Sequence, residues 1–453
     1  MSSAEANPAT QTSRDDVQKA MEVLGRRLDR QLAIAFHVCA HCGLCNDTCH
    51  YALAIDDPKM VPAYKADQLR KIYKRRYDWL ARLVPRWVGA KELDAEAIER
   101  LVDVAYGACT MCRRCVVNCP FGVDTALIVR TARAMLNAIG RTPRGLQEPI
   151  DIQLRVGNNG GVETQDFVET IQWWEEQLQA ELHALRSNFK IPLDKVGARV
   201  MCTLAPRELR TYPLTAMAMA KILHAAGENW TLSSRMWDAT NFALFSGDDA
   251  AARQVAQRTR DEAVRLGVEE VIWSECGHGY RAFRWEAEGW LGERFPFRVR
   301  ALVELIADYI AQGRIKLDPS KNSKPVTYHD PCNLARNSGI VDAPRYILKH
   351  AVTDFREMKP HGVNNFCCGG GGGVLFMSEF TERRKAASKI KAEQIKATGA
   401  KIVATSCHNC MDQLTDLNSW YRLGVEIHGI SELVADALVL PCAASNILLG
   451  ESP

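Results

Sequence analysis

Apolar positions in the first third of the chain recur with helical spacing. A helix is predicted from about residue 15 to residue 36, with apolar side chains every three or four positions at Val17, Met21, Leu24 and Leu28. Further helices are expected over 125–139 and 164–188, and the glycine-rich segment 141–165 is expected to be a linker. The N-terminal part of the chain is therefore predicted to be helical.

From about residue 196 the pattern changes to short apolar runs that alternate with helical segments. Strands are expected at 200–204, 271–273, 326–328, 401–405 and 425–427. The intervening helices include one that begins at Pro213 and one over about 379–398. The order of strands and helices occurs twice, at 196–320 and 321–440, which indicates an internal duplication. The predicted fold class is α+α/β: a helical domain followed by two pseudo-symmetric α/β domains with parallel sheets.

Composition restricts the function classes. The 453 residues carry 57 basic and 54 acidic side chains, so net charge gives no argument for nucleic-acid binding. The 16 cysteines are grouped at short spacings, which favours metal binding in a reducing compartment over disulfides. We expect no secretory signal, because residues 1–16 contain no apolar run. We also expect no transmembrane segment, because the longest uncharged runs, 362–378 and 437–450, are shorter than the ~20 apolar residues of a spanning helix. A cytoplasmic protein, soluble or peripheral, is expected.

Two cysteine motifs in the helical domain have the same spacing. Cys39, Cys42, Cys45 and Cys49 form the first, and Cys109, Cys112, Cys115 and Cys119, followed by Pro120, form the second. This spacing is typical of bacterial ferredoxins, in which the fourth cysteine of each run ligates the other cluster. One 4Fe–4S cubane is therefore expected on Cys39, Cys42, Cys45 and Cys119, and a second on Cys109, Cys112, Cys115 and Cys49. Zinc is the alternative, although zinc sites favour widely separated cysteine pairs.

Five further cysteines form a third pattern near the C-terminal end: Cys332, the pair Cys367-Cys368 followed by Gly369, and Cys407 with Cys410. Five thiols exceed the four ligands of a zinc site, and thiolates select iron–sulfur clusters, zinc or Cu(I). Cys332 and Cys407 each follow a predicted parallel strand, so both are expected at the carboxyl edge of one sheet, where such folds bind ligands. A phosphate-binding loop is excluded at Gly369–Gly373, because no Lys-Ser/Thr pair follows the glycines.

The first α/β repeat lacks most of this third pattern. We align Cys202 with Cys332, residues 245–247 with 367–369, and residues 276–279 with 407–410, so Cys202 and Cys276 are the sulfurs that it keeps. The first repeat is therefore interpreted as a structural partner that has lost its own cluster. Cys202 and Cys276 are either small buried hydrophobic residues or part of a substrate cleft between the repeats.

Polar residues beside the five cysteines are candidates for chemistry. His329, His408 and Arg336 are candidates to donate protons or charge-assisted hydrogen bonds to a leaving thiolate. The alternative for His329 and Asp330 is that they only shape the turn before Pro331.

Residues 65–87 form a basic and aromatic segment. It carries eight Lys or Arg against two Asp, interleaved with Tyr73, Trp79 and Trp87. An amphipathic helix of this composition is expected to rest on an anionic bilayer or on a partner; the alternative is a solvated basic face over a helical core.

The cysteine motifs together resemble a known family. The C-terminal pattern is similar to the CCG domain of heterodisulfide reductase catalytic subunits. The fusion of a duplicated ferredoxin region to two such units resembles the HdrD type, including DsrK, over roughly residues 30–440. The resemblance implies that the five cysteines (Cys332, Cys367, Cys368, Cys407 and Cys410) bind a special, noncubane or modified, 4Fe–4S centre. It further implies that this centre acts on a heterodisulfide or a protein-bound trisulfide.

The resemblance also implies partners. Members with a single such centre, the DsrK-like branch, dock on a membrane cytochrome b-type subunit that exchanges electrons with quinone, at the inner face of the cytoplasmic membrane. A small sulfur-carrier protein or a disulfide is the implied substrate. An electron-relay subunit of a glycolate-, lactate- or glycerol-3-phosphate-oxidising complex is the main alternative, and a zinc-stapled scaffold is a third.

The predicted organisation has six parts: a disordered N-terminus (1–14), a helical ferredoxin-like domain with two clusters (15–140), a linker and packing helix (141–195), a degenerate α/β domain (196–320), a complete α/β domain with the catalytic cluster (321–440) and a tail (441–453).

Overall fold

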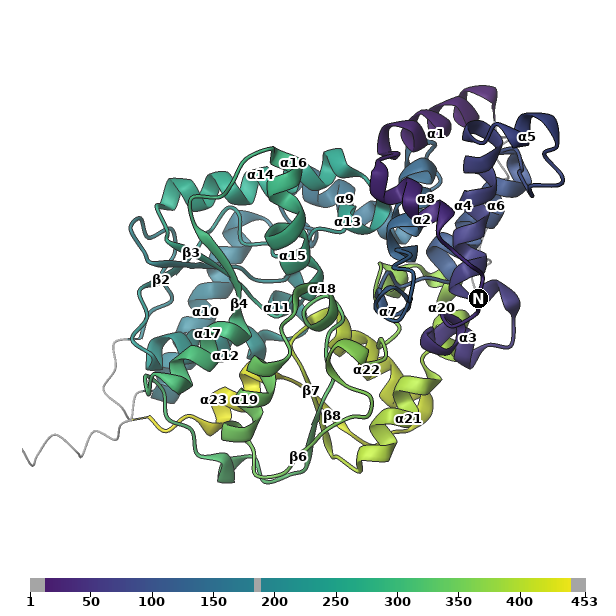
Figure 1. Ribbon diagram of the computed structural model, residues 1–453. Coiled ribbons are helices and arrows are strands. Elements are labelled where there is room, and N and C mark those ends of the chain that lie inside the picture. The colour runs from purple at the N-terminus through teal and green to yellow at the C-terminus, as the bar shows by residue number, and fades with distance from the viewer. Residues whose placement is uncertain (1–12, 183–188, 441–453) are drawn as a thin grey trace, which may run out of the picture.

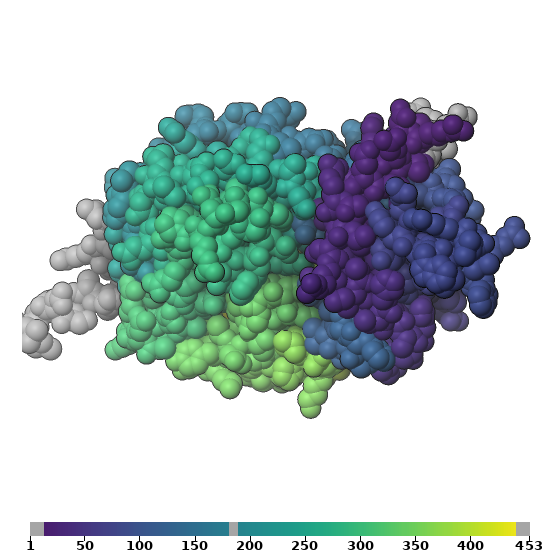
Figure 2. Space-filling model, turned by 45° about the horizontal axis from the view of Figure 1, so that its top comes forward, coloured from purple at the N-terminus to yellow at the C-terminus, as the bar shows by residue number. Residues whose placement is uncertain are grey.

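The computed structural model describes residues 13–182 and 189–440. The disorder predicted for residues 1–14 is wrong at its end, because Ser13 caps a helix that begins at Arg14. Residues 1–12, the end of the predicted 164–188 helix and the 441–453 tail with Cys442 lie outside the described residues. The helical N-terminal domain lies beside a larger body made of the two α/β units (Figure 1). In the space-filling view it forms a lobe of its own at one end of the molecule (Figure 2).

The helical domain packs around its last long helix. Within the described residues its helices are α1 (Arg14–Arg27), α2 (Arg30–His37), α3 (His50–Ala54), α4 (Pro62–Tyr77), α5 (Leu80–Leu83), α6 (Ala95–Val102), α7 (Arg114–Val117) and α8 (Thr125–Ala138). The predicted helix over 15–36 is thus two helices, because the Asp29 carboxylate accepts the Leu32 amide at 2.8 Å and caps a new one. Helix α8 contacts α1, α4 and α6 and contributes much of this core.

The segment expected to be a linker is mostly helical. It contains α9 (Arg144–Val156) and leads into α10 (Thr164–Leu182). Leu146 and Ile150 of α9 are buried in the core of the helical domain. On α10, Trp174 is buried in the core of the first α/β unit, whereas Trp173 is exposed. Apolar residues at helical spacing therefore prevail over the Pro and Gly signals of this segment.

The two α/β units have the same sheet topology. Strands β1 (Val200–Cys202), β2 (Trp230–Leu232), β3 (Glu270–Trp273) and β4 (Arg298–Ala301) form one parallel sheet in the order β2-β1-β3-β4. Strands β5 (Val326–Tyr328), β6 (Phe355–Arg356), β7 (Ile402–Thr405) and β8 (Glu426–Gly429) form the other, in the order β6-β5-β7-β8. The predicted α+α/β fold class with two parallel sheets is confirmed.

Helices cover both sheets. The first unit has α11 (Pro206–Arg210), α12 (Pro213–Ala225), α13 (Ala243–Ser246), α14 (Asp249–Leu266), α15 (Gly277–Arg281), α16 (Ala287–Leu291) and α17 (Leu302–Ala311). The second has α18 (Ala335–Ser338), α19 (Asp342–Ala351), α20 (Thr381–Ala387), α21 (Lys389–Thr398), α22 (His408–Tyr421) and α23 (Ile430–Ala437). The predicted 379–398 helix is divided at Ser388, whose hydroxyl donates to the Arg384 carbonyl at 2.7 Å.

The two units join through equivalent helices. Helix α12 of the first unit packs on α23 of the second, and α19 of the second packs on α17 of the first. Helices α12 and α19 each follow the first strand of their unit, and α17 and α23 each follow the last strand. The two contacts are therefore pseudo-symmetric copies of each other, and both units share one continuous hydrophobic core.

A single buried arginine joins the three parts of the molecule. Arg133 on α8 is fully buried. Its guanidinium donates to Ala105 O and Cys109 O of the helical domain at 2.9 Å each, to Phe245 O of the first α/β unit at 2.9 Å, and to Gly372 O of the second at 2.5 Å. The hydrogen bonds of this one guanidinium thus hold the loop of the second ferredoxin motif in place beside a loop of each α/β unit.

Candidate metal centres

The two ferredoxin motifs fold in the same way. His41 and Met111 hold the same place in their motifs and adopt left-handed φ values of 51° and 52°. Gly43 and Arg113, two residues further on, also have positive φ, at 83° and 63°. Such paired left-handed turns curl a backbone around a central site and point its amides inward. The spacing that identified the motifs therefore corresponds to one shared loop shape.

The eight motif cysteines line two cavities in a crossed arrangement. One cavity is lined by Cys39, Cys42, Cys45 and Cys119, and the other by Cys49, Cys109, Cys112 and Cys115. Cys115 also reaches the first cavity, so the two sites are adjacent. Among the described residues all cysteines are free thiols. Each predicted set of four soft ligands thus surrounds one space, which fits a thiolate-bound cluster.

A buried lysine accompanies the second of these cavities, and no motif identified it. Lys65 on α4 is almost fully buried; its ammonium lies 3.7 Å from Cys49 Sγ and 5.0 Å from the centre of the Tyr51 ring. A positive charge beside the thiols favours the negative charge of a thiolate cluster. The first cavity has no equivalent lysine in its lining.

The five C-terminal cysteines converge at one place. Neighbouring thiols shift one another's pKa along the series Cys332, Cys367, Cys368, Cys410 and Cys407, so all five lie side by side. The Cys368 and Cys410 sulfurs are 3.6 Å apart. The hydrogen bonds from its neighbours lower the pKa of Cys407 to about 7. The donor set is all sulfur and exceeds the four ligands of zinc, so the residues fit an iron–sulfur centre.

This five-cysteine site touches the second ferredoxin motif directly. The Cys112 thiol lies beside Cys367 and lowers the pKa of that thiol. The glycine run makes this approach possible, because a Cβ at Gly372 would lie 2.8 Å from the backbone of Thr110, where no side chain fits. Arg114 donates to Asn364 O at 2.8 Å and lies over the Phe366 ring. The three cysteine sets therefore form one continuous series.

The predicted histidines lie beside the five cysteines. A ring nitrogen of His329 lies within 4.8 Å of the Cys368 and Cys410 sulfurs, and its Nε2 has no hydrogen-bond partner among the described residues. His408 shares a hydrogen bond between Nε2 and Thr215 Oγ1 at 2.8 Å. Burial lowers the pKa of His408 to about 3 and that of His329 well below its usual range. Both imidazoles are thus neutral near pH 7, so each offers a neutral N–H rather than an imidazolium.

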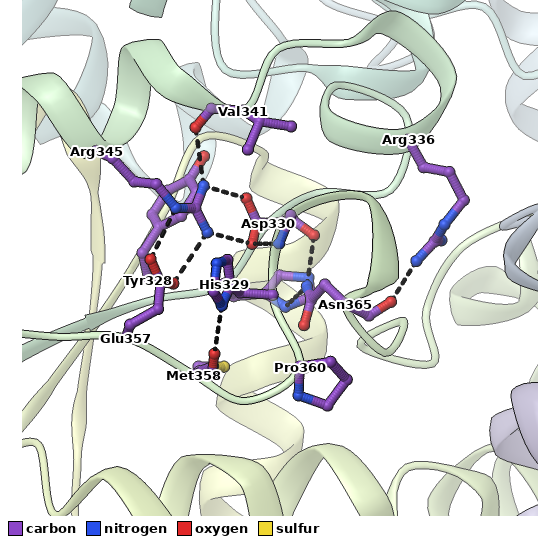
Figure 3. A network of polar contacts seen from close by, with 12 residues as sticks. Tyr328, His329, Asp330, Arg336, Val341, Arg345, Glu357, Met358, Pro360 and Asn365 are labelled. Carbon is purple, nitrogen blue, oxygen red and sulfur yellow. Dashed lines mark hydrogen bonds and ion pairs between the residues drawn. The ribbon is translucent and has the colours of Figure 1, made fainter. Parts of the chain in front are cut away.

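The turn after β5 is held by a salt-bridge network (Figure 3). Arg345 makes a bidentate pair with Asp330, at 2.8 Å to each oxygen, and a second pair with Glu357. Asp330 also accepts the Gly362 amide at 2.7 Å, and Asn365 donates to the Asp330 carbonyl at 2.9 Å. Asp330 therefore shapes this turn, which places His329 and Cys332 against the Cys367-Cys368 loop.

Arg336 has a structural role that the sequence did not predict. Its guanidinium donates to three backbone carbonyls: Val363 at 2.6 Å, Cys112 at 2.8 Å, and Asn365. The bond to Asn365 is drawn in Figure 3. These bonds tie the second ferredoxin motif to the segment before Cys367. These bonds use three of its five N–H donors, so the charge-assisted bond from Arg336 to a leaving thiolate stays a prediction.

Sheet register corrects the alignment of Cys202 with Cys332. Cys202 pairs with Ile272, and Tyr328 pairs with Ala404 at the equivalent place in the second sheet. Cys202 therefore corresponds to Tyr328, inside the strand, and is a fully buried core residue. By contrast, Cys276 and Cys407 are both the N-cap residue of the helix after the third strand, so that part of the alignment matches the structure.

A pocket of ≈ 220 Å³ lies between the two units. Its lining includes Arg207, Arg210, Cys276, His278, His408 and Asn409. Asn409 stands between Cys407 and Cys410 in the chain and donates to Gly370 O at 3.0 Å, so this wall of the pocket is the outer side of the five-cysteine site. Of the two cysteines of the first unit, only Cys276 lines the pocket. No sequence motif pointed to Arg207 or Arg210.

The pocket mouth is basic and its interior is neutral. Arg207 is exposed and pairs with Asp412 at 3.0 Å, and Arg210 donates to Gly160 O at 2.7 Å. Inside, the Cys276 sulfur lies 3.5 Å from His278 Nδ1, and burial lowers the pKa of His278 to about 3. The pocket is therefore suited to a ligand with a polar or anionic outer end and an uncharged inner end.

Comparison with known proteins agrees with this architecture. Residues 35–123 match the family described as a 4Fe-4S dicluster domain, and residues 326–415 match the cysteine-rich CCG domain. The chain is 29% identical to the Hdr-like menaquinol oxidoreductase iron-sulfur subunit 2 of Archaeoglobus fulgidus, covering 91% of this chain and 81% of that protein. It is 28% identical to a subunit of the dihydromethanophenazine:CoB–CoM heterodisulfide reductase of Methanosarcina mazei, covering 89% and 94% of the two chains.

These matches confirm the predicted resemblance to the HdrD-like family. The chain is a relative of iron–sulfur subunits of Hdr-like oxidoreductases, and it has the cysteine sets for electron transfer with iron–sulfur clusters. A more distant relative, the EtfAB:quinone oxidoreductase of Syntrophomonas wolfei, is 25% identical over 68% of this chain and 43% of its own length. No helix within the described residues is long and apolar enough to cross a membrane.

Proposed function

We propose that this chain is the catalytic iron–sulfur subunit of a membrane-associated, quinone-linked complex that reduces or oxidises a disulfide or trisulfide. The observation that carries the proposal is the convergence of Cys332, Cys367, Cys368, Cys407 and Cys410 beside Cys112, next to a pocket between the two α/β units. A thiol site that adjoins both an electron-transfer motif and a pocket is suited to redox chemistry on a bound ligand.

Each cysteine set has an assigned group in this proposal. Two 4Fe–4S cubanes are assigned to the crossed sets, Cys39, Cys42, Cys45 and Cys119, and Cys49, Cys109, Cys112 and Cys115. A special 4Fe–4S centre, noncubane or modified, is assigned to the five C-terminal cysteines. When bound, these groups supply one-electron transfer. Cleavage of a disulfide consumes two electrons and two protons and yields two thiols. Two successive one-electron transfers therefore supply the electrons for one cleavage.

The protein's own residues bind and orient the substrate. Arg207 and Arg210 at the pocket mouth attract an anionic end of the substrate. His408, whose Nδ1 is buried and has no partner among the described residues, offers hydrogen bonding at the inner end, and His329 does the same beside Cys368. Apolar residues such as Phe242 and Phe376 exclude water from the pocket. The arrangement binds the polar end of a sulfur compound at the pocket mouth and shields the other end of the compound from water.

The partners follow from where the first cysteine set lies. Cys42 is exposed, and Leu44 and Phe121 beside it are about half exposed. We assign this surface to the electron-exchanging partner, a membrane cytochrome b-type quinone-reactive subunit, at the inner face of the cytoplasmic membrane. A small sulfur-carrier protein or a low-molecular-mass disulfide is the assigned substrate. The names of the Archaeoglobus and Methanosarcina relatives, which include menaquinol and heterodisulfide, support these assignments.

The test uses the anaerobically reconstituted full-length chain and a reduced viologen dye. The wild type is expected to oxidise the dye when glutathione disulfide or a cysteine trisulfide is added. Cys368→Ser is expected to lose this turnover while the electron paramagnetic resonance signals of the ferredoxin-type clusters remain. Wild-type turnover by Cys368→Ser, or no turnover by the wild type with either compound, contradicts the proposal.

A relay subunit without sulfur chemistry is the second candidate function. The similarity to an EtfAB:quinone oxidoreductase favours it, because that relative is named for electron transfer to quinone and not for a sulfur substrate. The two functions differ in whether a thiol binds at the five-cysteine site. A paramagnetic signal of the oxidised protein that changes on addition of a thiol supports the catalytic function, and an unchanged signal supports the relay.

A further inference from the structure

The helical domain ends in an ordered tip that projects away from both sheets. The tip comprises α5 and the turns around it, residues 78–91, and lies at the outer edge of the domain (Figures 1 and 2). Three large apolar side chains stand in solvent here: Trp79 is 68% exposed, Leu83 72% and Trp87 83%. Val84 beside them is also exposed. A contiguous exposed apolar group of this kind marks an interaction site.

The apolar side chains are presented by a fixed backbone. Asp78 ends α4, and its carboxylate accepts the Leu80 amide at 2.9 Å to begin α5. The predicted amphipathic helix over 65–87 is therefore interrupted, and its aromatic residues divide between two environments, with Tyr73 buried and the two tryptophans exposed. Lys74 donates to Val88 O at 3.3 Å, which holds the tip against α4. The fold itself therefore holds the two tryptophans in their exposed positions.

Basic side chains surround the apolar tip. Residues 71–92 carry seven Lys or Arg and two acidic residues, whereas the net charge of the whole chain is only +3. Arg75 pairs with Glu92, but the exposed Arg76, Arg82, Arg86 and Lys91 have no carboxylate partner among the described residues. The positive charge of the molecule is thus concentrated where its most exposed aromatic residues are.

A basic pocket adjoins the tip. It has a volume of ≈ 360 Å³. Its lining combines apolar residues (Val17, Met21, Ile72 and Leu93) with Arg75, Arg76, Arg82 and Lys91, and with Glu92, which pairs with Arg75. Arginine forks bind phosphate oxygens with two parallel hydrogen bonds. The site therefore offers a phosphate-binding rim over an apolar floor.

We propose that this tip binds the surface of an anionic phospholipid bilayer, with Trp79, Leu83 and Trp87 in the headgroup region and a lipid phosphate in the basic pocket. Tryptophan and leucine on one side and arginine on the other are the composition of interfacial membrane anchors. The charge complementarity is with the negative surface of such a membrane. This inference deepens the proposed membrane association by adding a direct lipid contact to the partner contact.

The test is flotation of the reconstituted full-length chain with vesicles. Binding is expected to vesicles of equal parts phosphatidylglycerol and phosphatidylcholine, and to weaken with added salt. Arg82→Gln/Arg86→Gln is expected to weaken binding by about tenfold or more, because each basic residue near such a surface contributes about fivefold. Trp79→Ser/Trp87→Ser is expected to abolish binding, and Trp173→Ser, an exposed tryptophan on α10, is the matched control.

Folding and disulfide turnover are measured separately from vesicle binding. The tip variants are expected to keep the wild-type melting temperature, iron–sulfur absorbance and disulfide turnover in solution, so a loss of vesicle binding is not a loss of fold. Equal binding to pure phosphatidylcholine, no binding to either vesicle, or full binding by both double variants overturns the inference. If the vesicles bind but no disulfide is turned over, the proposed sulfur chemistry fails and the lipid contact stands.

Discussion

The two α/β units have the same topology, yet their carboxyl edges have opposite character. In the second unit, five thiols converge at the loops after β5, β6 and β7. In the first, the segment aligned with the cysteine pair, residues 245–247, lies at the end of α13 with Phe245 in the helical core, and Cys202 is a core residue of β1. Only Cys276 keeps the same N-cap place as Cys407. A shared backbone therefore supplies the positions, and the side chains decide whether one edge is a metal site or the wall of a pocket.

The largest expected effect comes from replacing the equivalent residues Cys407 and Cys276 by serine, each in its own variant. Cys407→Ser is expected to reduce disulfide turnover to background and to remove the iron of one of three clusters, about a third of the total. Cys276→Ser is expected to keep all the iron and to change turnover only a few-fold, because Cys276 lines the pocket. Iron content per chain and dye-linked turnover measure both. Equal iron loss in the two variants would show that the first unit contributes a ligand.

The next effect concerns Arg133, which binds the equivalent loops of the two units through Phe245 O and Gly372 O. Arg133→Met leaves four buried carbonyls without a donor and is expected to cost about 3 kcal/mol or more of folding free energy. Thermal unfolding of the reconstituted protein measures the loss. Arg144→Met, at a side chain that is 91% exposed, is the control and is expected to unfold as the wild type does. An unchanged melting temperature for Arg133→Met would contradict the bridging role.

The smallest effect is a pH dependence that belongs to the first unit. Glu208 after β1 is fully buried, accepts the Ser274 hydroxyl at 3.0 Å, and burial raises its pKa from 4.5 to about 8. The folded protein keeps this proton while the unfolded chain loses it, so the contribution to stability is present below about pH 4.5 and is lost as pH rises toward about 8.

Glu208→Gln is expected to remove this part of the pH dependence. The melting temperature of the wild type should fall more steeply than that of the variant as the pH is raised through this window. Glu96→Gln, at an 82% exposed carboxylate, is the control. Parallel melting curves for wild type and Glu208→Gln would show that Glu208 is ionised in the folded protein.

Local spacing explains why much of the architecture could be predicted. The two ferredoxin motifs each lie within eleven residues, and their loop shape depends on backbone turns at His41, Gly43, Met111 and Arg113, so spacing alone identified them. The strands before Cys407 and Cys332 were visible as short apolar runs. Strands β4 and β6 were missed because arginines (Arg298, Arg300 and Arg356) interrupt their apolar runs, and β2 was missed as well.

By itself, the sequence determined the class of ligand, since thiols at these spacings select iron–sulfur chemistry whatever surrounds them. It also determined the duplicated order of strands and helices. Only the tertiary structure decided that Cys112 meets Cys367, that Arg133 and Arg336 are used by backbone carbonyls, and that Cys202 lies within a strand. These facts depend on sheet register and on contacts between segments more than 200 residues apart. No local pattern encodes them, because such pairs meet only when the whole core packs.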